Sequence, residues 1–134
     1  MKFTQEEKEL LLKDLYARLL YKVKVCARFN TANRYNAEIT AISLDRDYVQ
    51  IRQNDLHPYT GSSIEDIRPY LRPMSSMTEE ERNSVEHWNW TVGGRDIEVS
   101  LSYIDWLNSH HFDYRGLIEK GLALEAPEGM YKNN

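Results

Sequence analysis

The sequence predicts an α+β domain in which an N-terminal helix precedes a small, strongly bent antiparallel meander or small barrel, followed by short helices and a hairpin. Apolar residues first recur at helical spacing and then alternate with period two. The length of 134 residues is usual for one domain and sufficient to bury a core without disulfides. We therefore expect 1–134 to be a single domain: helix 1–21, three-stranded meander 22–53, short helices and hairpin 64–110, and irregular tail 111–134.

The N-terminal helix is predicted from its start signal and its apolar stripe. Thr4 and Glu7 form a capping box, in which the Thr4 hydroxyl accepts from the Glu7 amide while the Glu7 side chain reaches back to the Thr4 amide. Apolar residues follow at spacings of three and four, namely Leu11, Leu12, Leu15, Tyr16, Leu19 and Leu20. A helix should begin near residue 5, end near Tyr21 and bury this stripe.

Strands are predicted next, because the apolar period changes to two. In 22–29, one face carries Val23, Val25, Ala27 and Phe29, and the other carries Lys22, Lys24, Cys26 and Arg28. This pattern indicates a half-buried strand with a basic outer face. The segments 37–44 and 48–52 flank a tight charged turn and read as a hairpin, followed by a polar loop over 54–63.

The second half contains weaker signals. Any helix after Ile64 should stop before Pro69, and the chain should then run extended. A second capping box, Thr78 to Glu81, predicts another helix. Alternating apolar residues on either side of Gly93-Gly94 predict a hairpin with one apolar face: Trp88, Trp90 and Val92 before it, Ile97, Val99 and Leu101 after it.

A short helix from Ser102 toward His110 is predicted to depend on packing. A helix of about two turns does not persist on propensity alone, so Trp106 and Leu107 should pack against the hairpin face. On this interpretation, Trp106→Ala costs about 3–5 kcal/mol, the range for emptying a buried aromatic site. The remaining residues should be largely irregular, with a frayed end.

Three stretches carry a family resemblance: DIRPYLRPMSSMTEEE at 66–81, DWLNSHHFDYRGLI at 105–118 and GLALEAP at 121–127. They resemble a family of small uncharacterised proteins encoded by gut Bacteroides and by their phages and prophages. The resemblance covers residues 64–131 and implies an intracellular, phage-related protein. It assigns no activity and no residue role.

Composition and charge narrow the function classes. Cys26 is the single cysteine, so an internal disulfide and a cysteine zinc site are excluded. No apolar run has signal-peptide or membrane-spanning length, so we expect a cytoplasmic protein without membrane contact. The formal charge is +4 over 1–34, −2 over 35–77 and −6 over 78–134. This asymmetry fits ordinary solvated surface, head-to-tail self-association, or a polyanion that contacts the first segment alone.

The candidate chemical groups favour no catalytic, cofactor or metal site. His110 and His111 are adjacent, so their side chains diverge and do not readily share one ion; a helix C-terminus explains the pair better. Cys26 lacks a neighbouring base that would make it a nucleophile. Phosphate-binding and dinucleotide motifs are absent. We therefore expect a protein that is not an enzyme and uses no cofactor.

Two binding functions remain. The preferred one is a protein-binding or self-associating module, with Trp88, Trp90 and Trp106 as a possible interface, because tryptophan is enriched at interface hot spots. The alternative is a small-barrel nucleic-acid binder, which the pI of about 5.6 disfavours. Its contacts would come from Arg18, Lys22, Lys24, Arg28 and Arg34, beside the aromatic residues Tyr16, Tyr21, Phe29 and Tyr35. Nucleic-acid affinity would fall steeply with salt, whereas an apolar interface would not.

Overall fold

The structure is a computed structural model that describes residues 3–43, 47–89 and 97–131, with side chains described outside 86–89 and 97–100. Its helical elements are α1 (Gln5–Arg18), η1 (Leu19–Tyr21), η2 (Ile64–Asp66), η3 (Met74–Ser76), α2 (Glu79–Asn89) and α3 (Ile97–Ser109). Its strands are β1 (Lys24–Ala27), β2 (Tyr35–Ser43), β3 (Tyr48–Arg52), β4 (Thr60–Ser63), β5 (Arg68–Pro73), β6 (Phe112–Asp113) and β7 (Leu124–Glu125).

The strands form one mixed sheet that is not closed. Their order is β4-β3-β2-β1-β5-β6, with β7 also paired to β5. Strands β1 to β5 are antiparallel neighbours, whereas β6 and β7 run parallel to β5. The α+β fold is confirmed, and the meander is open rather than a closed barrel. A register shift between Ile39 and Ala41 marks an irregularity in β2, where a strand can bend.

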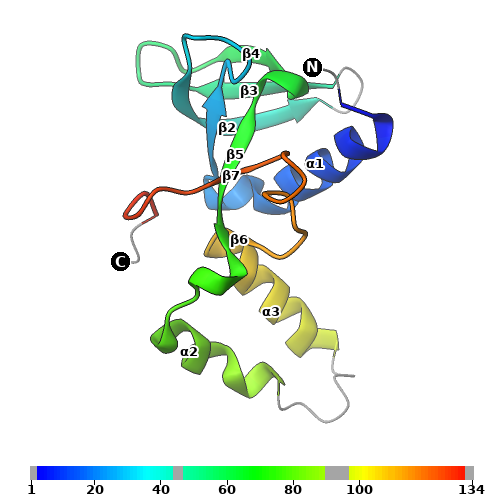
Figure 1. The fold of residues 1–134 in the computed structure, drawn as a ribbon, viewed down its shortest axis with the longest axis vertical. Coiled ribbons are helices and arrows are strands. Elements are labelled where there is room, and N and C mark those ends of the chain that lie inside the picture. Colours follow the sequence, from blue (N-terminus) through cyan, green and yellow to red (C-terminus); the bar gives the residue numbers. More distant parts are fainter. Residues whose placement is uncertain (1–2, 44–46, 90–96, 132–134) are drawn as a thin grey trace.

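The two ends of the molecule differ in architecture (Figure 1). Helix α1 lies against one side of the sheet, and α2 and α3 project together from the end near β6. Strand β5 runs between these two parts, and the C-terminal segment crosses it. No helix within the described residues is long and apolar enough to cross a membrane.

The core lies between α1 and the inner face of the sheet. Leu11 and Leu15 of α1 are fully buried in one cluster with Val25, Ile39 and Ile51 of the strands. The capping box at Thr4 is present, with the Glu7 amide donating to the Thr4 hydroxyl at 3.1 Å. The predicted helix is therefore confirmed, but its predicted stripe is buried only in part, because Tyr16 and Leu20 are exposed.

Strand β1 is more buried than its alternation predicts. Cys26, expected on the outer face, is only 3% exposed. The strand is central, with β2 on one side and β5 on the other. The prediction of a half-buried strand with a basic outer face is therefore wrong at Cys26, and only partly right at Lys24, which is half-buried.

The predicted hairpin around Gly93-Gly94 is wrong for the residues that the structure describes. Trp88 belongs to α2, and Ile97 to Leu101 form the first turns of α3; Trp90 and Val92 lie outside the described residues. Three alternating apolar residues are a short pattern, and Ile97, Leu101 and Ile104 also fit helical spacing. Helix α3 is accordingly longer than the two turns expected from Ser102.

The C-terminal tail is irregular, as predicted, but it is packed rather than peripheral. Phe112, Leu117 and Leu122 are almost completely buried. Asp113 accepts from the amides of Leu117 and Ile118 at 2.8 and 2.9 Å, which orders a segment without regular structure.

Candidate functional site

Arg18, predicted as a nucleic-acid contact, is fully buried and unavailable to a ligand. Its guanidinium pairs with the carboxylate of Asp14, one turn earlier, at 2.8 and 3.1 Å. It also donates to the carbonyl of Phe112 at 2.6 Å, a contact that spans 94 residues of sequence. Asp14 and Arg18 are four residues apart, so they lie on one face of α1 and are buried together as a charged pair.

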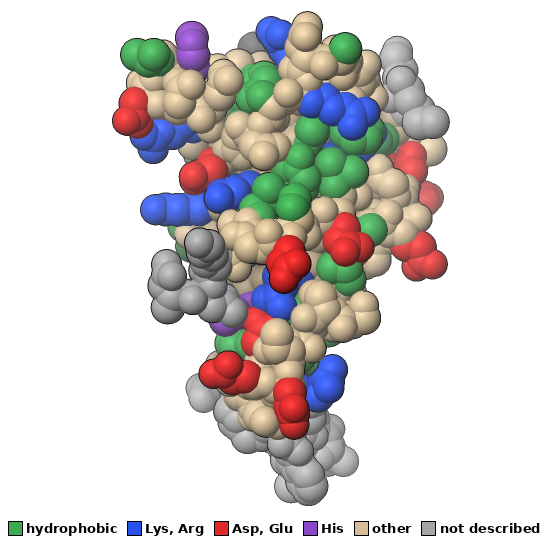
Figure 2. Space-filling model, turned by 60° about the vertical axis from the view of Figure 1, so that its left-hand side comes forward, with side chains coloured by type: hydrophobic (Ala, Val, Ile, Leu, Met, Phe, Trp, Pro, Cys, Tyr) green, Lys and Arg blue, Asp and Glu red, His purple; other side chains and the backbone are tan. Residues whose placement is uncertain are grey.

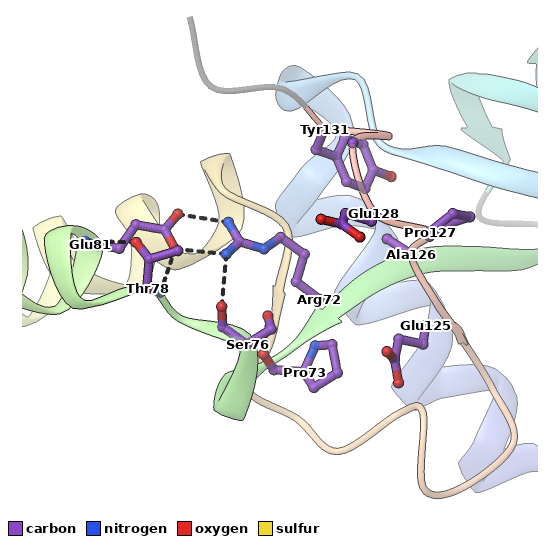
Figure 3. A pocket seen from close by; sticks show the side chains of 11 residues that line it. Arg72, Pro73, Ser76, Thr78, Glu81, Glu125, Ala126, Pro127, Glu128 and Tyr131 are labelled. Atoms are coloured by element: carbon purple, nitrogen blue, oxygen red, sulfur yellow. Dashed lines mark hydrogen bonds and ion pairs between the residues drawn. The ribbon is translucent and has the colours of Figure 1, made fainter.

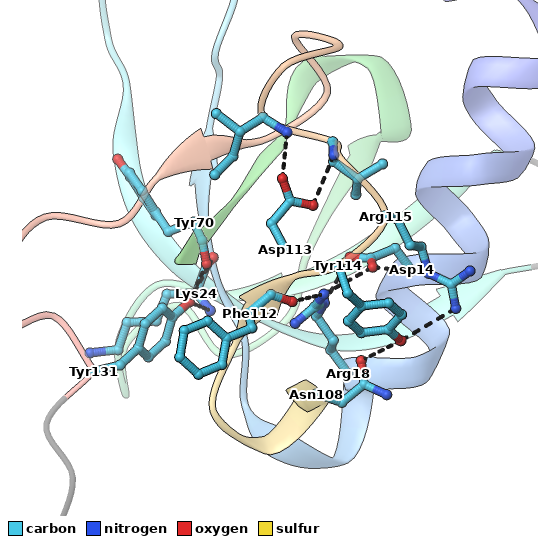
Figure 4. A network of polar contacts seen from close by, with 12 residues as sticks. Asp14, Arg18, Lys24, Tyr70, Asn108, Phe112, Asp113, Tyr114, Arg115 and Tyr131 are labelled. Carbon is cyan, nitrogen blue, oxygen red and sulfur yellow. Dashed lines mark hydrogen bonds and ion pairs between the residues drawn. The ribbon is translucent and has the colours of Figure 1, made fainter. Parts of the chain in front are cut away.

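The buried pair belongs to a network that joins α1 to the C-terminal segment (Figure 4). Arg115 lies 3.2 Å from the second oxygen of Asp14, so one carboxylate faces two guanidinium groups. Arg18 also lies over the Tyr114 ring, and the Tyr114 hydroxyl donates to Asn108 of α3 at 2.8 Å. The network connects three parts of the chain and fixes the base of α3.

Lys24, a second predicted contact, is held by the C-terminal segment. The Tyr131 hydroxyl accepts from the Lys24 amide at 2.8 Å and donates to the Tyr70 carbonyl at 2.8 Å, bridging β1 and β5. The Lys24 ammonium donates to the Met130 carbonyl at 3.4 Å. Burial raises the pKa of Tyr131, which therefore stays a protonated donor.

The remaining three predicted basic contacts, Lys22, Arg28 and Arg34, are exposed. Arg34 stacks over the Phe29 ring at 4.2 Å, and Arg68 covers the same ring at 4.3 Å. On the face shown in Figure 2, basic and acidic side chains are interspersed around a central apolar patch. Of the five basic side chains predicted to contact a nucleic acid, three are therefore exposed and available for such a contact.

The proposed tryptophan interface is only partly described. The side chain of Trp88 and the whole of Trp90 lie outside the described part of the structure. Trp106 is half-buried and stacks on His110 and Phe112, with ring centroids 4.1 and 5.7 Å apart. Leu107 is buried, as expected, so this turn of α3 is held by packing.

Trp106→Ala is expected to lower the free energy of unfolding by about 2 kcal/mol, below the full cost of a buried aromatic site, because Trp106 is only half-buried. Urea denaturation of the variant measures this loss. Trp106→Phe is the control, since it keeps the stacking on His110 and Phe112. An unchanged midpoint for Trp106→Ala would place Trp106 in an interaction surface instead.

The two adjacent histidines have different environments. The Nδ1 atom of His110 lies 3.0 Å from the Trp106 carbonyl at the end of α3. His111 adopts a left-handed conformation, with φ of 64°, and its ring stacks on Tyr131 at 3.7 Å. Burial, followed by the nearby charge of Arg18, lowers the pKa of His111 to about 4. His111 is therefore neutral near pH 7 and belongs to the contact between α3 and the C-terminal segment.

A cavity of about 400 Å³ lies between β5, the start of α2 and the C-terminal segment (Figure 3). Arg72 points across it and binds Glu81 through two contacts, of 2.6 and 2.7 Å. The same Glu81 completes the predicted capping box with Thr78. Because the Arg72 guanidinium also stacks on Phe112 at 4.1 Å, its charge serves the fold rather than a ligand.

The acidic side chains near this cavity do not form a metal site. Glu125 and Glu128 are exposed at its edge. Among the described residues, no three histidine, cysteine, aspartate or glutamate side chains are grouped to hold an ion. The described residues around the cavity therefore provide polar and apolar contact surface but no group of side chains that could hold a metal ion.

Large apolar side chains are exposed on α3 and at the end of α1. Leu101 and Ile104 of α3 are 57% and 38% exposed, with the exposed carboxylate of Asp105 beside them on the same helix. Leu20 of η1 is 87% exposed, and Tyr16 one turn earlier is 44% exposed. The exposed side chain of Lys22 lies two residues after Leu20. Neither apolar surface is covered by described residues, and both adjoin a charge.

Sequence reasoning missed several residues that hold these elements together. Asp14 lies four residues before Arg18, a spacing that indicates an ion pair but not its burial. Arg72 binds Glu81, nine residues later in the sequence, and Tyr131 binds Tyr70, 61 residues earlier. No local sequence pattern identifies contacts over these separations.

Comparison with known proteins finds no matching family model, curated protein or solved structure.

Proposed function

We propose that the protein is a non-enzymatic binding module that associates with a second copy of itself, head to tail. The observation that carries this proposal is a pair of separate exposed apolar surfaces, one where α1 ends and the other on α3. One surface is Leu20 with Tyr16, and the other is Leu101 with Ile104. Exposed apolar groups of this size favour association because contact removes them from water.

Charge complementarity supports a second copy of the chain as the binding partner. The exposed Lys22 lies two residues after Leu20, whereas the exposed Asp105 directly follows Ile104, so a cation lies near the first surface and an anion near the second. The same sign difference extends along the chain, from +4 in residues 1–34 to −6 in residues 78–134. A head-to-tail contact brings unlike charges together, whereas pairing either surface with itself brings like charges together.

Sedimentation velocity at micromolar concentrations is expected to show species larger than the 15.8 kDa chain, at both low and high salt. Leu20→Glu and Leu101→Glu should each weaken association by about tenfold or more, because a carboxylate loses solvation in an apolar contact. Leu56→Glu is the matched control, since Leu56 is 85% exposed in the connection between β3 and β4.

Mixing the two variants tests the head-to-tail arrangement directly. Leu20→Glu retains the α3 surface and Leu101→Glu retains the η1 surface, so the mixture should form a 1:1 pair that neither forms alone. A wild-type chain that remains monomeric at both salt concentrations would contradict the proposal.

The cellular setting belongs to the same proposal. A cytoplasmic location is supported by the single cysteine, and a phage or prophage setting rests on the resemblance of residues 64–131. Protein binding is preferred to nucleic-acid binding because Arg18 is buried and Lys24 is held by Tyr131 and Met130. Neighbouring genes for replication, recombination or packaging would test the setting.

A further inference from the structure

Strand β4 has an unpaired edge. Within the described residues it is the terminal strand of the sheet order and pairs with β3 alone. Directly after it, the Ile64 amide donates to the Asp47 carbonyl at 2.9 Å. Because bonded positions alternate in an antiparallel pair, the backbone groups of Thr60 and Ser62 face β3, whereas those of Gly61 and Ser63 point away from the sheet.

This edge opens onto a groove. A volume of about 370 Å³ separates β4 from the connection between β1 and β2, within the ~300–1,000 Å³ range of ligand sites. All four β4 residues line it, with Arg28, Thr31, Asn33 and Tyr35 on the other wall. None of the four β4 residues is charged or proline, so β4 lacks two common features that protect an edge strand from pairing.

The charge of the groove favours an acidic occupant. Arg28 is exposed, and its side chain has no hydrogen-bond or ion-pair partner among the described residues. The carboxylate of Asp66, which also lines the groove, already accepts from the Asn30 side chain at 3.2 Å. The Asp66 carboxylate also interacts electrostatically with the Arg68 guanidinium, so the Arg28 cation beside the unpaired backbone groups remains without an ion-pair partner among the described residues.

A narrow extended segment fits this place better than a second copy of the chain. In each copy of the chain, the connection between β1 and β2 forms the groove wall opposite β4. Pairing the β4 strands of two copies would therefore bring this connection of one copy against the other copy. An extended peptide requires only one backbone width beside β4, and its alternate side chains point to opposite faces of the sheet.

We propose that β4 is a docking site for an extended acidic segment of another protein, which adds to the sheet as a strand and presents a carboxylate to Arg28. The Gly61 and Ser63 amides donate to its carbonyls. This site is separate from the surfaces of Leu20 and Leu101, so it does not depend on the proposed self-association.

The probe is a random nine-residue peptide library displayed on yeast and selected on the intact wild-type protein. Selected sequences are synthesised, and their affinities are measured by fluorescence polarisation. We expect sequences rich in Asp or Glu. Arg28→Gln should weaken them several-fold at low salt, and less at high salt, because exposed charges are screened.

Ser63 offers a matched pair of variants. Its φ of −67° suits proline, so Ser63→Pro removes the edge amide without opposing the local backbone. Ser63→Ala keeps the amide and loses only the hydroxyl that accepts from the Glu65 amide at 3.3 Å. We expect Ser63→Pro to weaken peptide binding by about tenfold or more relative to Ser63→Ala.

An N-methylation scan of the best peptide gives a second readout on the wild-type protein, independent of how well Ser63→Pro folds. Methylation should abolish binding at alternate positions only, because every second peptide amide faces β4. Failure to select any peptide, equal affinity for both Ser63 variants, or a scan without period two would overturn the proposal. Wild-type oligomers that Ser63→Pro dissociates and Ser63→Ala retains would instead assign the edge to a second copy.

Discussion

Asp14→Ala is expected to lower the free energy of unfolding by about 3–5 kcal/mol. Asp14 and Arg18 are both fully buried, and removing the carboxylate leaves the guanidinium charge without a counterion in the protein interior. Arg115, which approaches the same carboxylate at 3.2 Å, loses its partner as well. Urea denaturation followed by circular dichroism measures the change.

The double variant Asp14→Leu/Arg18→Met is the control for this substitution. It removes both buried charges and keeps apolar volume in their place, so it should recover a large part of the stability lost in Asp14→Ala. A single variant as stable as the wild-type protein would show that the pair is hydrated rather than buried. A double variant less stable than the single one would indicate that the contact from Arg18 to the Phe112 carbonyl dominates.

The protein is expected to lose about 2 kcal/mol of stability between pH 7.5 and pH 5.0 through His111 alone. Its pKa is about 4 in the folded state, where burial disfavours the imidazolium, and about 6.5 in an unfolded chain. Between these values the unfolded state binds the proton and the folded state does not. Stability is therefore fully present above pH 6.5 and declines as the pH falls toward 4.

Urea denaturation at the two pH values, with His111→Asn as the comparison, isolates this contribution. Asparagine tolerates the left-handed conformation at position 111 but does not titrate in this range. The other histidines and all carboxylates remain in both proteins, so the difference between the two pH dependences belongs to His111. If the free energy of unfolding fell equally in the wild-type protein and in His111→Asn between the two pH values, His111 would be solvated in the folded state.

Local patterns predicted the elements whose stabilising contacts are local. The capping boxes at Thr4 and Thr78 placed the starts of α1 and α2 because each box closes within four residues. The period of two placed β1, and the tight charged turn between two strand-like segments placed β2 and β3. The hairpin at Trp88 failed because a few alternating residues fit a helix equally well. Strand β4 was missed because Thr60-Gly61-Ser62-Ser63 has no apolar alternation; it exists by pairing with β3.

The candidate site was predicted less well than the fold. Arg18 and Lys24 belong to segments that look basic and exposed in the sequence, yet Phe112, Met130 and Tyr131 cover or hold them. Each of these contacts spans more than 90 residues. The sequence pattern of α1 and β1 contains no information about which distant segment lies on them.

The sequence by itself determined the class of the fold, the helix that covers the sheet and the order of the first three strands, because periodicity and capping act between residues a few positions apart. The tertiary structure alone decided which charges are buried, where the C-terminal segment packs and which strand edge stays unpaired. These features depend on burial and on hydrogen bonds between distant segments. Asp14 and Arg18 show the distinction: their spacing predicts an ion pair, and only the packing of Phe112 and Tyr114 over them removes it from water.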